Sequence, residues 1–178
     1  MERRLGVRWA RLALAFLAIG GVLRGQGSVP RPAPELKIAE SSGKTTMLSS
    51  YRGRVVLLAF ISTQCGHCQR ASQVFERLAH EFGGKLQVAA IAFDEGADTA
   101  AFEKRFGLTF PVGTSTSDAA HSFLGIAAGV RIGTPQVVAI DGAGVIRAQS
   151  ERQGTPMLQT QEYLRGLLNA LLPKEAGR

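Results

Sequence analysis

Two largely apolar runs mark the centre of the chain. Residues 54–61 (RVVLLAFI) and 86–93 (LQVAAIAF) are rich in aliphatic and β-branched side chains, which is the pattern of strands buried on both faces of a sheet. Between the runs, apolar residues recur at helical spacing and stop at a pair of glycines; these apolar residues are Ala71, Val74, Phe75, Leu78 and Phe82. The pattern predicts a strand, a helix and a second strand.

Two shorter helices are expected after the second strand. The first covers residues 98–106 and has a glycine directly behind it. The second covers 117–124, where Ser117 or Asp118 is the predicted cap and Gly125 the predicted stop.

The last third of the chain predicts a β-hairpin and a helix. Residues 136–140 and 145–148 read as strands joined by the turn DGAG. Thr155-Pro156 has the cap-then-proline arrangement that opens a helix, and the apolar stripe behind it is Leu164, Leu167, Leu168 and Leu171. The order of elements predicts an α/β sandwich with a central mixed sheet flanked by helices.

The segment before the first long strand is polar and turn-rich. Residues 36–51 predict a small hairpin around SSGK. Residues 28–35 carry prolines at alternate positions, which favours an extended linker. We expect one domain over residues 36–173, followed by a short tail at 174–178.

The first 27 residues have the layout of a signal peptide or an N-terminal membrane anchor. Four arginines precede the apolar run LALAFLAIGGVL, and the small residues of GQG follow it. Five arginines and one glutamate give this segment +4 of the net charge of +7. The basic residues of the remainder are scattered, which argues against nucleic-acid binding. We therefore expect an extracytoplasmic protein, in a compartment where disulfides persist.

The only two cysteines lie in the stretch STQCGHCQR, where the first long strand passes into the helix. Residues three apart in a helical turn are about 5 to 6 Å apart, so Cys65 and Cys68 can form a disulfide. The unpaired N–H groups and the dipole at a helix N-terminus favour a thiolate. Cys65 is therefore the expected nucleophile, and Cys68 the thiol that resolves the mixed disulfide.

His67 lies between the two thiols. A partly protonated imidazole near Cys65 would stabilise the thiolate, and this raises the reduction potential of the couple. The alternative is an exposed polar residue in a turn.

These residues resemble the thioredoxin superfamily, and within it the exported TlpA/ResA-like thiol–disulfide oxidoreductases with a redoxin (AhpC/TSA-like) domain. The resemblance covers about residues 34–172. It is carried by the strand GRVVLL before the cysteines and by the later motifs FDE, FPV and GTP before VVAID. It implies a thioredoxin-like three-layer sandwich with an N-terminal hairpin extension. It also implies protein thiols or disulfides as substrates, a membrane redox protein as electron donor or acceptor, and no cofactor.

The resemblance assigns further site residues. Pro135 would be a cis-proline facing the disulfide, and the backbone of Thr134 would pair with the substrate chain. Gln64 and Gly66 would also contact the substrate, although Gln64 stands where the family usually has a tryptophan. The dipeptide Gly66-His67 is that of disulfide isomerases and favours oxidation or isomerisation, whereas the TlpA-like layout favours a reductant, often in cytochrome c maturation.

A second departure concerns the proton of Cys68. Thioredoxins have a buried acid six residues before the first cysteine, and Ala59 stands there. Water, Glu95 or no group at all then accepts this proton.

Two alternatives use the same cysteines differently. A peroxiredoxin-like peroxidase would match Ser62, but Leu58 stands where its proline is expected. A metal chaperone could use Cys65, His67, Cys68 and His121, but CxxC supplies only half of a tetrahedral site. We expect no metal.

Overall fold

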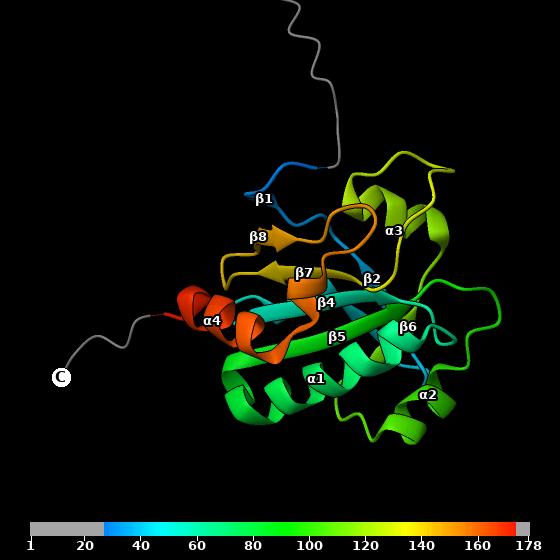
Figure 1. Ribbon diagram of the computed structural model, residues 1–178, viewed down its shortest axis with the longest axis horizontal. Helices are drawn as coiled ribbons and strands as arrows, with labels where there is room; N and C mark the ends of the chain where they lie inside the picture. The colour runs from blue at the N-terminus through cyan, green and yellow to red at the C-terminus, as the bar shows by residue number, and fades with distance from the viewer. Residues whose placement is uncertain (1–26, 174–178) are drawn as a thin grey trace, which may run out of the picture.

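The computed structural model describes residues 27–173 (Figure 1). The signal or anchor segment, apart from Gly27, and the tail at 174–178 lie outside these residues. One sheet of eight strands forms the centre, in the order β1-β8-β7-β4-β5-β6-β2-β3. The strands are β1 Arg31–Pro32, β2 Lys37–Glu40, β3 Thr45–Met47, β4 Val55–Ile61, β5 Leu86–Ala92, β6 Val112–Thr114, β7 Gln136–Ile140 and β8 Val145–Gln149.

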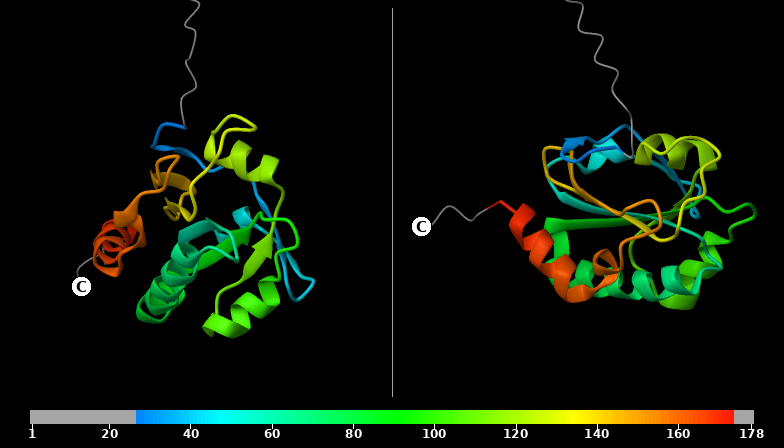
Figure 2. Two further views of the ribbon diagram at one scale, coloured as in Figure 1. Left: turned by 45° about the vertical axis from the view of Figure 1, so that its right-hand side comes forward. Right: turned by 45° about the horizontal axis from the view of Figure 1, so that its top comes forward.

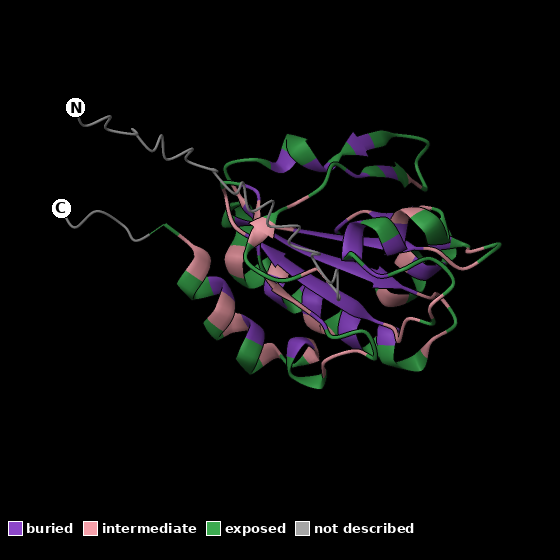
Figure 3. Cartoon of the chain, turned by 90° about the horizontal axis from the view of Figure 1, so that it is seen from above, coloured by how far each residue is buried: buried purple, intermediate pink, exposed green. Residues whose placement is uncertain are grey.

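The sheet is mixed, as predicted. Strands β4, β5 and β6 run parallel to one another, whereas β4 pairs antiparallel with β7 and β7 with β8. The seven residues of β4 are all buried, because alternate side chains pack on opposite faces of the sheet (Figure 3). The sequence of β4 is therefore apolar at every position and does not alternate with polar residues.

Helices cover both faces of the sheet and give the expected three layers. Figure 2 shows α3 on one side and α1, α2 and α4 on the other. Their bounds are α1 Gly66–Phe82, α2 Thr99–Phe106, α3 Ser117–Leu124 and α4 Gln161–Leu171, with short 3-10 turns at Leu48–Tyr51, Gly83–Lys85 and Pro156–Gln159. No helix within residues 27–173 is long and apolar enough to cross a membrane.

The N-terminal hairpin is present as β2 and β3, and β2 also pairs with β6. The segment 28–35, expected to be an extended linker, is extended but is not a free spacer. Its residues Arg31–Pro32 pair with β8, and the Arg31 guanidinium donates to the Phe123 carbonyl (2.8 Å) and to Gln149 Oε1 (2.7 Å). These bonds hold residues 28–35, called the leader below, against the edge of the sheet.

Three details differ from the sequence analysis. The short strand β6 was not predicted, because only Val112 in it carries a large apolar side chain; a Cβ on Gly113 would lie 2.5 Å from the Ile38 side chain, so the close contact with β2 requires glycine. Helix α3 is capped by Thr116 and not by Ser117 or Asp118.

The predicted start of the last helix was also wrong. Thr155-Pro156 opens a separate 3-10 turn, and extended backbone at Thr160 separates this turn from α4. The predicted leucine stripe is present, since Leu164 and Leu168 are fully buried.

Candidate active site

Both cysteines lie at the N-terminus of α1, at the edge of the sheet where β4 ends. Cys65 is the N-cap residue, and Cys68 is the third residue of the helix. The backbone N–H of Cys65 donates to the Ser62 carbonyl (3.2 Å), and its own carbonyl accepts the first helical bond from Gln69 (3.0 Å). Both cysteines are free thiols, Cys65 half-buried and Cys68 fully buried.

Cys65 is set up to ionise. Burial by itself raises the pKa of its thiol, but donors around the sulfur outweigh this effect and hold the pKa below its ordinary value. These donors are the backbone N–H of Cys68, the side chains of Thr134 and Cys68, and the backbone N–H of His67. The thiol makes no capping hydrogen bond, whereas a thiolate in the N-cap position is the stronger acceptor for the N–H groups of the first turn.

Cys68 has the opposite character. Burial raises the pKa of its thiol to about 12. Its sulfur belongs to the same apolar cluster as Ala59, where a methyl group fills the place of the buried acid of thioredoxins. The two thiols therefore differ in ionisation as well as in exposure.

A loop after α3 faces Cys65. The peptide bond between Thr134 and Pro135 is cis, as the resemblance implied. The Thr134 carbonyl oxygen lies 3.7 Å from Cys65 Sγ and accepts a hydrogen bond from the thiol. The loop thus places a backbone carbonyl beside the predicted nucleophile.

This loop is held from behind by the segment that leads to the last 3-10 turn. Gln136 is fully buried, and its Nε2 donates to the carbonyls of Gly133 (2.7 Å) and Glu151 (2.9 Å). A Cβ on Gly133 would lie 2.5 Å from the Gln153 carbonyl oxygen, so only glycine allows this contact.

The remaining predicted residues lie on the rim. Gln64, Gly66 and His67 are exposed next to Cys65. The imidazole Nδ1 of His67 lies 3.2 Å from Nη2 of Arg70. The part of His67 that acts on the Cys65 sulfur is its backbone N–H.

Sequence reasoning missed the residues that hold the loop before Cys65. The Asp94 carboxylate accepts hydrogen bonds from the backbone N–H (3.2 Å) and the hydroxyl (2.8 Å) of Thr63. Gln69 Nε2 in turn donates to the Thr63 carbonyl (3.2 Å). The signal for Asp94 was an acid directly after a buried strand.

The other candidates of the sequence analysis are exposed or are already bonded. Glu95 is exposed in the loop after β5. His121 is buried, with its ring nitrogens 2.7 Å from the Ser117 carbonyl and 2.8 Å from the Val130 carbonyl. Within residues 27–173 no three His, Cys, Asp or Glu residues gather as a metal site.

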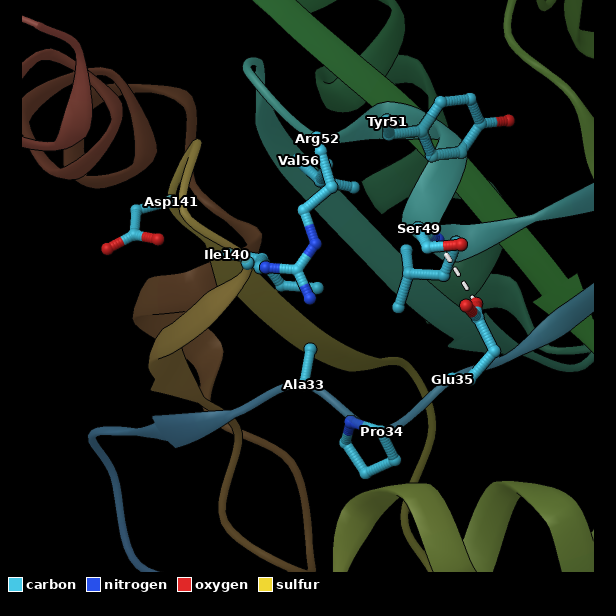
Figure 4. Close-up of a pocket in the computed structure, with 11 residues that line it drawn as sticks. Ala33, Pro34, Glu35, Ser49, Tyr51, Arg52, Val56, Ile140 and Asp141 are labelled. Carbon is cyan, nitrogen blue, oxygen red and sulfur yellow. Dashed lines mark hydrogen bonds between the residues drawn. The ribbon is translucent and has the colours of Figure 1, made fainter.

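A small pocket at the far end of β4 is unrelated to the thiols (Figure 4). It lies between the leader and the paired residues Val56 and Ile140, with Arg52 and Asp141 on its walls. Its volume is about 110 Å³. The candidate active site lies at the cysteines, where two thiols with opposite pKa shifts meet the loop at Thr134.

Comparison with known proteins shows the family of the chain. The model of the AhpC/TSA family matches residues 29–149, which include both cysteines and the loop at Pro135. The chain belongs to the AhpC/TSA family. The thiol-disulfide oxidoreductase ResA of Geobacillus kaustophilus (strain HTA426) is 31% identical over 121 residues, which are 62% of this chain and 69% of ResA.

Two further proteins show how much of the chain is similar to known proteins. The thioredoxin-like protein YneN of Bacillus subtilis (strain 168) is 31% identical over 96 residues, 52% of this chain and 54% of YneN, so the chain spans about half the length of that relative. The crystal structure of a thioredoxin-family thiol:disulfide interchange protein from Chlorobium tepidum TLS has a TM-score of 0.67 at 19% identity, over 83% of this chain and 99% of the other. It shows the fold alone. Together these findings confirm the resemblance: the chain is a TlpA/ResA-like thiol–disulfide oxidoreductase with a thioredoxin fold.

Proposed function

We propose that the protein exchanges dithiol for disulfide in exported proteins, with Cys65 as nucleophile and Cys68 as resolving thiol. The observation that carries this proposal is the contrast between the two sulfurs. The pKa of Cys65 is lowered and its thiol reaches the surface, whereas Cys68 is fully buried with a pKa raised to about 12. Cys65 is therefore the thiol that ionises more readily and the one that a partner can reach.

The reduction of a partner would proceed in two steps. The Cys65 thiolate attacks one sulfur of the partner disulfide, forming a mixed disulfide and releasing the other partner sulfur as a thiolate. Cys68 then loses its proton and attacks Cys65 Sγ, which releases the second partner sulfur. Two electrons pass to the partner, the released thiolates take up two protons, and Cys65 and Cys68 end as a disulfide. Oxidation of a partner dithiol is the same sequence reversed.

The partner chain would lie across the rim formed by Thr134, Gln64 and Gly66. The position of the Thr134 carbonyl beside Cys65 Sγ supports this, since an extended chain paired with the loop would bring its sulfur to the nucleophile. Pro135 supports the same loop from inside, where it is buried. Because Gln64 is polar, this rim lacks one large apolar contact.

The charge and hydropathy pattern of the first 27 residues supports an extracytoplasmic location, by a cleaved signal or a retained anchor. A membrane redox protein would then supply or remove the electrons. Cytochrome c maturation is the corresponding role for a reductant, and disulfide formation for an oxidant.

The reduction potential of the Cys65–Cys68 couple tests the proposal and decides its direction. The protein is equilibrated with glutathione buffers, and free thiols are counted by alkylation and mass. A potential of about −180 mV or above indicates an oxidant or isomerase, and one of about −270 mV a reductant. Cys65→Ser is the matched control without a couple. A wild-type mass that stays that of the dithiol in every buffer would overturn the proposal.

A further inference from the structure

A row of polar side chains follows Cys68 along helix α1. Ser72, Glu76 and His80 come at successive steps of four residues, and residues at this spacing are neighbours on a helix surface. Cys68 and Ser72 are fully buried, Glu76 is 9% exposed, and His80 lies at the surface. Ser72 therefore sits between the buried thiol and a buried carboxylate.

Within residues 27–173, the hydroxyl of Ser72 is completely buried without a hydrogen-bond partner. A buried hydroxyl without a partner destabilises the fold and calls for an explanation. Alanine would fill the same place in the helix without this cost.

Glu76 does not need the hydroxyl. One of its oxygens accepts from the backbone N–H of Thr109 (2.9 Å), and the other from the Thr109 hydroxyl (2.8 Å) and from Nε2 of His80 (2.8 Å). Both carboxylate oxygens are thus paired. The other polar neighbour of Ser72 in the row is the resolving thiol, whose charged form is disfavoured by burial more than it is favoured by the backbone of Ser62 and the side chain of Thr134.

The direction of helical side chains brings the two groups together. Side chains in a helix lean toward the N-terminus, so the Ser72 side chain leans over the turn that carries Cys68. Their Cβ atoms are about 5 to 6 Å apart at this spacing. The Cys68 side chain leans the same way, toward Cys65, so the bond forms when χ1 of Ser72 and χ1 of Cys68 both rotate.

We propose that Ser72 is a positioning residue for the resolving step, in which its hydroxyl donates a hydrogen bond to Cys68 Sγ as the thiolate forms. The inference rests on the proposed function. In this step the bond between the Cys68 and Cys65 sulfurs forms, and the bond between Cys65 and the partner sulfur breaks. The proton of Cys68 passes through solvent to the departing partner thiolate, and Ser72 keeps its own. No buried acid is required, which accounts for Ala59.

Reaction of the reduced protein with 5,5′-dithiobis(2-nitrobenzoate) separates the two steps. Attack by Cys65 releases one thionitrobenzoate and leaves the other in a mixed disulfide, and attack by Cys68 releases the second. In Ser72→Ala we expect an unchanged first release, and a second release slower by about ten-fold or more, because a hydrogen bond to a charged sulfur is lost. The pH midpoint of the second release should also rise. Ser72→Thr, which keeps the hydroxyl, should restore the rate, and Gln73→Ala, an exposed neighbour in the same turn, should change nothing.

The inference is overturned if Ser72→Ala gives the wild-type rate and pH midpoint of the second release, or if both releases slow equally. A merely structural serine predicts the first of these results, with equal or higher thermal stability of Ser72→Ala. If the wild-type protein releases only one thionitrobenzoate, the dithiol chemistry itself fails, and the role of Ser72 fails with it.

Discussion

The Asp94 carboxylate holds Thr63 by two groups, the backbone N–H and the hydroxyl, with an Oγ1–Oδ2 distance of 2.8 Å. Thr63 lies two residues before Cys65, and Asp94 lies two residues beyond the end of β5. Strands β4 and β5 are parallel neighbours, so their C-terminal ends meet at the same edge of the sheet. The pair therefore ties the loop in front of the nucleophile to the adjacent strand.

Breaking this pair should loosen the site. We expect Asp94→Ala to lower the free energy of unfolding by about 1 to 3 kcal/mol, since it leaves a half-buried N–H and a hydroxyl unpaired. Thr63→Val should cost about 1 kcal/mol, because the N–H bond remains. Urea unfolding of the two single variants and the double variant measures the coupling. Strictly additive losses would show that the two groups do not interact.

The elements around the site could be predicted from local signals, whereas the Asp94–Thr63 pair could not. The apolar run of β4 and the helical spacing of α1 placed the cysteines at a strand-to-helix junction, and the structure has them there. The bond from Thr63 to Asp94 joins positions 31 residues apart. It depends on the order and register of two strands, and these are tertiary properties with no local pattern.

The same limit explains the missed strand and the misplaced helix start. Strand β6 is defined by pairing with β5 and β2, and its glycine is needed for contact with Ile38, a residue far away in the sequence. The signal at Thr155-Pro156 was correct for a helical turn. The turn ends at Gln159, and its residue Leu158 is buried in the same cluster as Cys68. No neighbouring residue in the sequence predicts this contact.

His67 provides a test that separates backbone from side chain. Because its N–H is one of the groups that lower the pKa of Cys65, His67→Pro, which lacks an N–H, should raise that pKa. Proline is tolerated in the first turn of a helix, so the fold should survive. His67→Ala keeps the N–H and should raise the pKa less. Thiolate absorbance against pH, in a Cys68→Ala background, measures both. A larger shift in His67→Ala would show that the imidazole dominates.

The difference in exposure and ionisation should make alkylation selective. Near neutral pH, limited iodoacetamide should modify Cys65 and leave Cys68 intact, because burial raises the pKa of Cys68 to about 12. Peptide mass mapping identifies the modified thiol. Cys68→Ser should further trap a mixed disulfide between Cys65 and a partner, which Cys65→Ser should not form. Modification of both thiols at equal rates would contradict the assigned roles.

The raised pKa of Cys68 also predicts that the dithiol form loses stability in alkali. A thiol whose pKa is higher in the folded than in the unfolded state contributes stability that is fully present below the unfolded pKa. This contribution is lost as the pH rises toward the folded value of about 12. At about pH 10, one unit above the ordinary value of 9.0, the expected loss is on the order of 1 kcal/mol.

Cys65 acts in the opposite sense, because its lowered pKa adds stability as the pH rises to its unfolded value. The control must therefore keep Cys65 and remove only the buried thiol. Cys68→Ala does so, and it is compared with the reduced wild-type protein by urea unfolding at about pH 7 and about pH 10. The variant has lost a buried sulfur at both pH values, so its overall stability is lower, but its loss between them should be smaller by on the order of 1 kcal/mol. Equal losses in the two proteins would mean that Cys68 ionises in the folded state as readily as in the unfolded chain, and the contrast between the two thiols would then rest on exposure alone.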